Sequence, residues 1–121
     1  MNPFIRAVRR ALSSEERALL EWLIANGTPD AMQYAPQLAD IRVVGLCTCG
    51  CPTLDLAIGN REERTTGPSH VLAEFDGTTA EGVQVCVILH AREGQISELE
   101  VIAIDDFEGE FSLPVIESLR R

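Results

Sequence analysis

Three of the four cysteines in this chain of 121 residues fall within five positions, at Cys47, Cys49 and Cys51, which we call the cysteine cluster. Sulfur is the ligand atom that soft metal ions such as Zn²⁺ prefer, so this spacing is the clearest chemical signal in the sequence. Zinc sites are usually built from two Cys-x₂₋₄-Cys pairs, whereas the pattern here is Cys-x-Cys-x-Cys. Alternate side chains of an extended strand lie about 6.6 Å apart, too far for three sulfurs to share one ion. Only a tight turn at Gly50 could bring the sulfurs together.

A zinc ion would need a fourth ligand, and the candidates that remain are Cys86, His70 and His90. If the third and fourth predicted strands form a hairpin with Phe75 opposite Val83, these three side chains lie on one face of the sheet. Cys86 and His90 are about 13 Å apart along one strand, so they cannot bind the same ion. Zinc held by the cysteine cluster is therefore an alternative to our main prediction, and we expect no other cofactor.

Structural roles compete with these chemical ones. Reduced cysteines often pack as small apolar side chains, and Gly50 and Pro52 are typical of turns. A thioredoxin-like redox pair is not indicated, because Cys49-Gly50-Cys51 is not a Cys-x-x-Cys pair at the start of a helix. A nucleophilic cysteine would need a histidine base, and neither histidine is near the cysteine cluster in the sequence.

The motifs of the large enzyme classes are absent from the sequence. It has no Gly-rich phosphate loop, no Gly-x-Ser-x-Gly nucleophile elbow and no His-Glu-x-x-His helix. The acidic stretch 105–110 lacks the regular alternation and the closing glutamate of a Ca²⁺ loop, so it fits a solvated turn better. We therefore predict that the protein is not an enzyme.

Acidic residues dominate the charge. The chain has 19 Asp and Glu against 10 Arg, with no Lys, and its formal net charge is −9. Nucleic-acid binding depends on basic clusters that neutralise phosphates, so this balance argues against it. Seven acids and no base lie between residues 95 and 119: Glu98, Glu100, Asp105, Asp106, Glu108, Glu110 and Glu117. Such a face would attract a basic protein surface, although acids also keep small proteins in solution.

No membrane segment is predicted. No apolar run reaches the length of about 18 residues that spans a bilayer. The basic start of the chain leads into Ser13, Ser14, Glu15 and Glu16 rather than into an apolar secretory region. We expect a cytoplasmic protein whose cysteines are reduced.

The first third of the chain has helical spacing. Residues 1–12 are interpreted as an amphipathic N-terminal extension, attached loosely to a single domain over 13–121. Ser13 followed by Glu16 matches a capping box and predicts the start of a helix, which Gly27 ends as a left-handed stop.

A second helix is predicted after Thr28, with Pro29 at its first position. It covers 29–35, or is kinked and reaches residue 39, because Pro36 removes an interior hydrogen bond.

From residue 41 the apolar positions alternate with period two, which is typical of half-buried strands. The five predicted strands are 41–48, 54–58, 70–76, 83–90 and 96–104. Short connections favour antiparallel neighbours, and a short helix follows Leu113-Pro114. The predicted fold class is therefore α+β, with two N-terminal helices packed on a mostly antiparallel five-stranded sheet and a short C-terminal helix.

Two stretches resemble known sequences: 43–52, Val-Val-Gly-Leu-Cys-Thr-Cys-Gly-Cys-Pro, and 94–101, Gly-Gln-Ile-Ser-Glu-Leu-Glu-Val. They are similar to a family of small uncharacterised bacterial proteins with a Cys-x-Cys-Gly-Cys-Pro hairpin and a Leu-Glu-Val strand. The resemblance covers 41–115, and it implies no activity and assigns no functional residue. The Gly-x-x-x-x-Leu-Glu-Val portion is also similar to small cytosolic proteins that neutralise toxins.

The main functional prediction is a non-enzymatic protein-interaction module with an acidic surface, which binds a protein partner or a second copy of itself. The first alternative is a protein that binds a soft metal, zinc, through the cysteine cluster. The second is a small-ligand pocket inside a cone-shaped sheet, because the order of elements is similar to that of nuclear-transport-factor folds. Neither nucleic acid nor a membrane is an expected partner.

Overall fold

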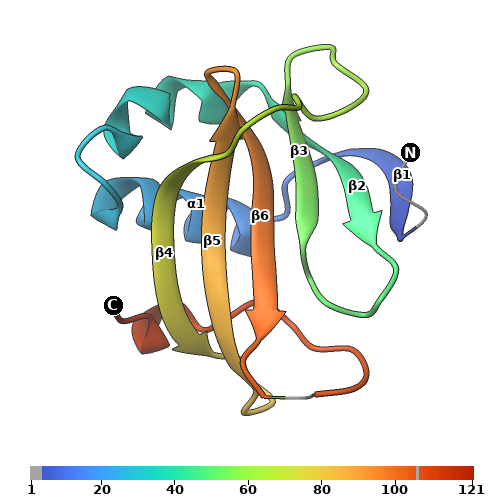
Figure 1. Cartoon of the computed structure of the whole chain (residues 1–121), viewed down its shortest axis with the longest axis vertical. Coiled ribbons are helices and arrows are strands. Elements are labelled where there is room, and N and C mark those ends of the chain that lie inside the picture. The colour runs from blue at the N-terminus through green and yellow to red at the C-terminus, as the bar shows by residue number, and fades with distance from the viewer. Residues whose placement is uncertain (1–3, 106) are drawn as a thin grey trace.

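The residues after 41 whose apolar positions alternate form five strands of an antiparallel sheet, and the N-terminal segment adds a sixth strand (Figure 1). The computed structural model describes residues 4–105 and 107–121. The elements are β1 (Ile5–Ala11), α1 (Ser14–Asn26), the 3₁₀ helix η1 (Ala31–Ala39), β2 (Ile41–Cys47), β3 (Leu54–Ile58), β4 (His70–Thr78), β5 (Gln84–Arg92), β6 (Gln95–Ala103) and the 3₁₀ helix η2 (Ile116–Ser118). The strand order is β1-β2-β3-β6-β5-β4, and every neighbouring pair is antiparallel. The α+β class and the antiparallel sheet are confirmed.

The predicted loose extension is wrong for residues 5–11, which form the edge strand β1. Ile5 lies opposite Cys47 and Ala11 opposite Arg42 on β2. A bulge between Ala7 and Arg10 inserts one extra residue, so the two partly buried side chains of β1, Ile5 and Val8, are three positions apart. Apolar residues three positions apart are typical of a helix, which explains why the sequence did not predict this strand. Residues 1–3 of the predicted extension lie outside the described residues.

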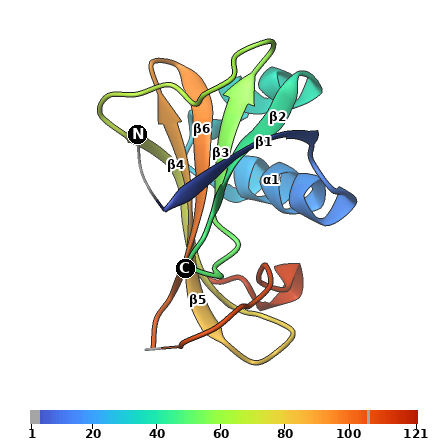
Figure 2. The same ribbon diagram turned by 90° about the vertical axis from the view of Figure 1, so that its right-hand side faces the viewer.

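Figure 2 shows α1 lying against one face of the sheet, and the apolar core is formed between the two. The helix contributes a fully buried stripe of Leu19, Leu20, Leu23 and Ile24. The sheet contributes alternate residues of its strands, such as Val85, Val87 and Leu89 of β5, all of which are buried. Burying a side chain of this size stabilises the fold by about 1.5–3 kcal/mol, so this layer fixes α1 against the sheet.

The end of α1 and the start of the second helix differ from prediction. Gly27 has φ −82°, so it is not a left-handed stop. Its lack of a side chain is needed for another reason, because a Cβ there would collide with the Leu72 carbonyl oxygen of β4. The Thr28 amide donates to that same oxygen at 2.8 Å. The second helix has the 3₁₀ form and begins at Ala31, two residues later than predicted, and it reaches Ala39 as in the longer of the two predicted forms.

The predicted short C-terminal helix is the single 3₁₀ turn η2, and the C-terminal segment around it lies along the outer edge of β4. Residues on both sides of η2 bridge to that strand, with Pro114 opposite Thr79 and Arg120 opposite Asp76. Two hydrogen bonds join the backbones of Asp76 and Arg120, at 2.8 and 2.9 Å. The segment therefore covers part of a sheet edge that would otherwise be open to pairing.

The predicted capping box is confirmed, and it is reinforced by β1. The Glu16 amide donates to Ser13 Oγ at 3.1 Å, and the Ser13 amide donates to Glu16 Oε1 at 2.8 Å. The Arg10 guanidinium donates to both carboxylate oxygens of Glu16, at 2.8 and 2.9 Å. Burial acts to raise the pKa of Glu16, but the bonds from Arg10 and Ser13 outweigh it and the pKa is lowered.

We expect Glu16→Ala to lower the free energy of unfolding by about 1–2 kcal/mol at neutral pH, because both the cap and the β1 contact are lost. A carboxyl group with a lowered folded-state pKa stabilises the fold above its ordinary pKa, and this contribution disappears as the pH falls through the lowered value. Urea denaturation of wild type and variant at neutral and acidic pH measures the difference, which should shrink in acid. Glu15→Ala, an exposed position in the same turn, is the control. A loss that does not change with pH would contradict this account.

Candidate metal centre

The cysteine cluster lies at the turn between β2 and β3. Cys47 ends β2, whereas Cys49 and Cys51 lie in the connection. Gly50 has φ +100°, a conformation that residues with a Cβ rarely adopt, and it lets the chain reverse between the last two cysteines. The tight turn that the spacing requires is therefore present.

The turn brings the three sulfurs together. Cys49 Sγ lies 2.9 Å from Cys47 Sγ and 2.9 Å from Cys51 Sγ, and all three sulfurs lie within 4.8 Å of one another. Cys49 is exposed, and the other two are partly buried. The three ligand atoms are therefore close enough to share one ion, and one of them faces solvent.

The thiols of Cys47 and Cys49 differ in acidity because of these contacts. Hydrogen bonding to Cys47 and Cys51 lowers the pKa of Cys49. Burial, together with hydrogen bonding to Cys49, raises the pKa of Cys47. Cys49 therefore becomes a thiolate, the form that binds metals, more readily than Cys47 does.

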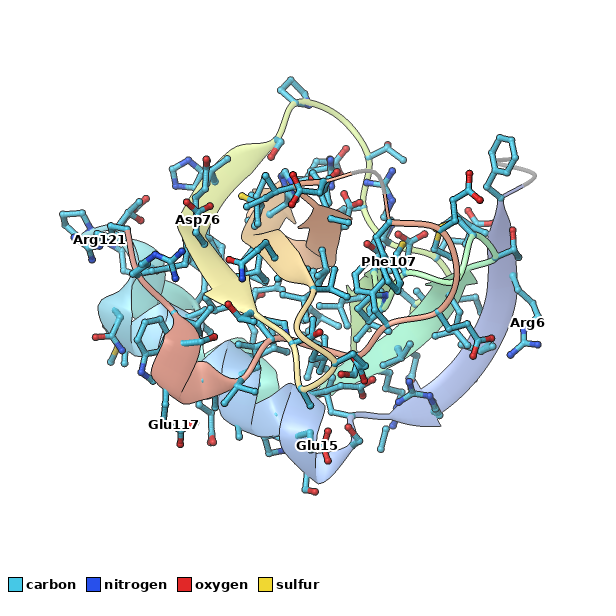
Figure 3. All side chains as sticks on the ribbon, turned by 90° about the horizontal axis from the view of Figure 1, so that it is seen from below. Arg6, Glu15, Asp76, Phe107, Glu117 and Arg121 are labelled. Atoms are coloured by element: carbon cyan, nitrogen blue, oxygen red, sulfur yellow. The ribbon has the colours of Figure 1, made fainter. Side chains whose placement is uncertain are left out.

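The cysteine turn is also held by distant parts of the chain. The Phe4 carbonyl, next to β1, accepts hydrogen bonds from the amide and hydroxyl of Thr48 at 2.7 and 3.0 Å. On the other side the Phe111 amide donates to the Gly50 carbonyl at 3.3 Å. A Cβ at Gly50 would lie 3.0 Å from the Gly109 oxygen, so the segment after β6 packs directly against the turn. Figure 3 views the molecule from this end, where Phe107 of the same segment is labelled.

Thr53 fixes the base of the turn to β6. Its hydroxyl donates to the Val101 carbonyl at 3.2 Å and accepts from the Val101 amide at 2.9 Å. Cys51 Sγ lies 3.4 Å from the same hydroxyl. Because Thr53 is buried and bonded in both directions, it holds Cys51 close to the end of the sheet.

The predicted register between β4 and β5 is wrong. Phe75 lies opposite Val87 rather than Val83. The strand continues through Gly77 to Thr78, beyond the predicted end at residue 76. A Cβ at Gly77 would lie 2.9 Å from a methyl carbon of Leu119, so this glycine allows close packing of the C-terminal segment.

Both histidines have partners away from the cysteine cluster. His70 Nε2 lies 2.5 Å from Asp30 Oδ2. His90 Nδ1 lies 2.5 Å from Ser69 Oγ, and its Nε2 lies 2.8 Å from Glu100 Oε1. His90 thus connects the loop before β4 to the face of the sheet that α1 does not cover.

Cys86 lies on that same face, opposite Asp76 on β4 and Ile102 on β6. Burial raises the pKa of Cys86, and the nearby carboxylates of Glu74 and Asp76 raise it further. Neither Cys86 nor a histidine joins the cluster. In the described part of the chain the three clustered cysteines form the one group of His, Cys, Asp or Glu that could hold a metal.

The acidic segment predicted as a partner surface lies next to the cysteine turn. Asp105, Glu108 and Glu110 belong to it, whereas Asp106 lies outside the described residues. Three large apolar side chains are exposed there: Ile102 at 45 %, Ile104 at 54 % and Phe107 at 43 %. The sequence did not indicate that this segment packs on the hairpin, because no local pattern records a contact between residues so far apart in the chain.

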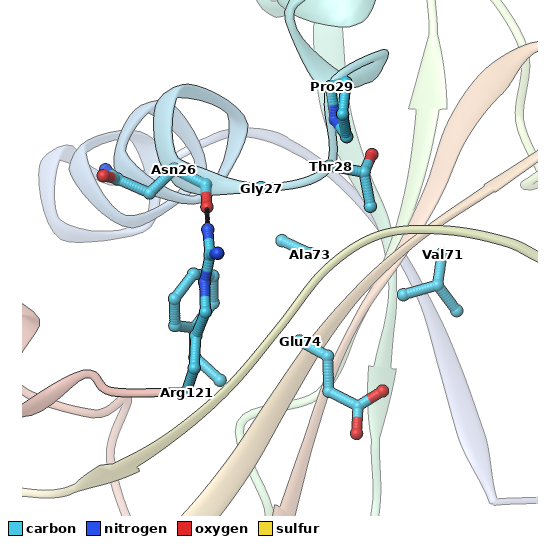
Figure 4. A pocket seen from close by; sticks show the side chains of 9 residues that line it. Asn26, Gly27, Thr28, Pro29, Val71, Ala73, Glu74 and Arg121 are labelled. Atoms are coloured by element: carbon cyan, nitrogen blue, oxygen red, sulfur yellow. Dashed lines mark hydrogen bonds between the residues drawn. The ribbon is translucent and has the colours of Figure 1, made fainter.

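A depression of about 360 Å³ lies elsewhere, at the edge of β4 between the end of α1 and Arg121 (Figure 4). The Arg121 guanidinium donates to the Asn26 carbonyl, and its central carbon lies 5.3 Å from the centre of the Phe75 ring. Arg121 therefore neutralises the carbonyl end of α1. The depression lies beside the sheet, so the predicted pocket within a cone-shaped sheet stays a prediction.

Comparison of the sequence and structure with protein-family models, curated proteins and solved structures gave no match. The predicted hairpin with its cysteine cluster is present, but the family resemblance stays a prediction. None of the helices within the described residues is both long and apolar enough to cross a membrane.

We expect Gly50→Ala to be more destabilising than Gly82→Ala. Both glycines have positive φ, +100° and +90°, so the backbone strain is similar. Nothing lies within 4 Å of a Cβ at Gly82, whereas one at Gly50 would press on the 109–110 backbone. The difference in the free energy of unfolding, measured with urea, should be about 1–3 kcal/mol, the usual cost of overpacking. Equal losses would show that the contact with segment 107–111 does not hold the turn.

Proposed function

We propose that this protein binds a soft metal ion through the three thiolates of the cysteine cluster. The observation that carries the proposal is that the three sulfurs lie within 4.8 Å of one another on a single turn. Metal–sulfur bonds of about 2.3 Å at tetrahedral angles place sulfurs about 3.8 Å apart. The sulfurs that are 2.9 Å apart would therefore need to separate by only about 1 Å, which side-chain rotation supplies.

The surroundings of the cluster support this proposal. Hydrogen bonds to the Phe4 carbonyl and from the Phe111 amide, together with the contact to Thr53, hold the turn before any ion arrives, so little ordering is required on binding. The exposed Cys49 gives an ion a path from solvent. The competing interpretation treats the cysteines as buried apolar groups, and it fits less well because none of the three is buried.

The reduced protein should hold one equivalent of a soft metal ion per chain. Protein is incubated separately with Zn²⁺ and with Cu⁺ under anaerobic conditions, desalted and analysed for metal content. Cys49→Ser should weaken binding by at least about 100-fold, because loss of an outer partner of a ligand alone costs about 10–100-fold. Cys86→Ser, which removes the thiol outside the cluster, should bind like wild type. Failure of the wild-type protein to retain either ion would overturn the proposal.

A second candidate function is binding of a basic protein surface by the segment that follows β6. The observation in its favour is that exposed apolar side chains, Ile102, Ile104 and Phe107, lie among the exposed acids Asp105, Glu108 and Glu110. Apolar area supplies affinity and the acids supply long-range attraction, which is the usual composition of a docking surface.

If this second candidate is correct, cross-linking in native lysate at low salt captures a basic partner. Cross-linking at high salt captures much less of it, because salt screens the attraction between exposed charges. The variant Glu108→Gln/Glu110→Gln should lose most of the captured partner. The control Glu15→Gln/Glu21→Gln removes two exposed acids from α1 and should keep it. If the amount of captured partner changes neither with salt nor in the Glu108→Gln/Glu110→Gln variant, the acidic surface is not what binds it.

A further inference from the structure

The number of donor atoms limits which ion the cysteine cluster can hold. All three sulfurs come from one turn, and within the described residues no histidine, carboxylate or fourth cysteine offers a ligand atom to the group. The Thr53 hydroxyl oxygen lies 3.4 Å from Cys51 Sγ. It already accepts from and donates to the backbone of Val101, so it has little capacity to bind an ion.

Candidate fourth ligands elsewhere are committed to other contacts. His70 is bonded to Asp30, and His90 is bonded through both ring nitrogens to Ser69 and Glu100. Recruiting His90, which is buried, would break its hydrogen bonds to both Ser69 and Glu100. Within the described residues the cysteine turn therefore presents three soft donors, and the fourth thiol, Cys86, lies apart from them.

Soft metal ions differ in whether three sulfur ligands complete their coordination. Structural zinc is almost always held by four protein ligands, and zinc with three protein ligands keeps a water as the fourth. Iron–sulfur clusters are usually held by four thiolates. Cu⁺ is softer, is selected by thiolate sulfur, and is satisfied by three sulfur ligands without a hard oxygen donor.

Resting on the proposed function, we infer that the ion of the cysteine cluster is monovalent copper, bound by the sulfurs of Cys47, Cys49 and Cys51 alone. The partly buried Cys47 and Cys51 hold the ion from the hairpin side, and the exposed Cys49 completes the set from the solvent side. Because one ligand faces solvent, an incoming thiolate can displace Cys49 and remove the ion. The site is therefore suited to exchange of Cu⁺ rather than to permanent storage.

The test is a competition between the two ions in the full chain. Fully reduced protein is loaded with one equivalent of Zn²⁺ under anaerobic conditions, and Cu⁺ is then added with a chromophoric Cu⁺ chelator as reference. We expect one Cu⁺ to bind per chain and the bound zinc to be lost. X-ray absorption at the copper edge should show sulfur neighbours alone, and each of Cys47→Ser, Cys49→Ser and Cys51→Ser should lower Cu⁺ affinity. Cys86→Ser should not.

The outcomes separate this inference from the proposed function. Zinc that resists displacement by Cu⁺, or nitrogen or oxygen neighbours at the copper edge, would overturn the inference while leaving soft-metal binding intact. A single cysteine variant that keeps full Cu⁺ affinity would overturn the three-sulfur arrangement. If the wild-type chain binds neither ion, both proposals fail together. Circular dichroism of each variant shows whether its fold is retained, and an unfolded serine variant is replaced by alanine at the same position.

Discussion

The structure depends on a short junction between β3 and β6, where two three-stranded halves of the sheet meet. Only two residue pairs join these strands, Leu54 with Leu99 and Asp55 with Glu98. The Thr53 hydroxyl extends the junction by taking both hydrogen bonds of the Val101 backbone. Because the cysteine turn begins directly beyond this junction, the same contacts that join the sheet also set the position of the candidate site.

The position of the turn explains how a five-residue stretch can act as a ligand set. Segments from both ends of the chain contact it, the Phe4 carbonyl from one side and the Phe111 amide from the other. A free hairpin of this length would sample many arrangements of its thiols, whereas contacts on two sides restrict it. Thiols held in advance lose less conformational entropy on binding. The exposed acidic and apolar segment beside the turn places a candidate partner surface next to a candidate metal site.

Local patterns predicted local structure well. The capping box of Ser13 and Glu16 and the five alternating strands were confirmed because each depends on residues a few positions apart. The errors arose where distant parts of the chain decide the outcome. The edge strand β1 was missed because its bulge imitates helical spacing, and the β4–β5 register was wrong because Gly77 serves close packing and not a turn.

The sequence by itself determined the chemistry available to the candidate site, since residue type sets ligand softness and Gly50 permits the turn. It also determined the fold class, because periodicity distinguishes helix from strand. Tertiary structure alone decided that the three sulfurs converge, that both histidines are bonded elsewhere, and that the segment 107–111 covers the turn. The physical reason is that periodicity depends on residues a few positions apart in the sequence, whereas strand register and packing depend on contacts throughout the core.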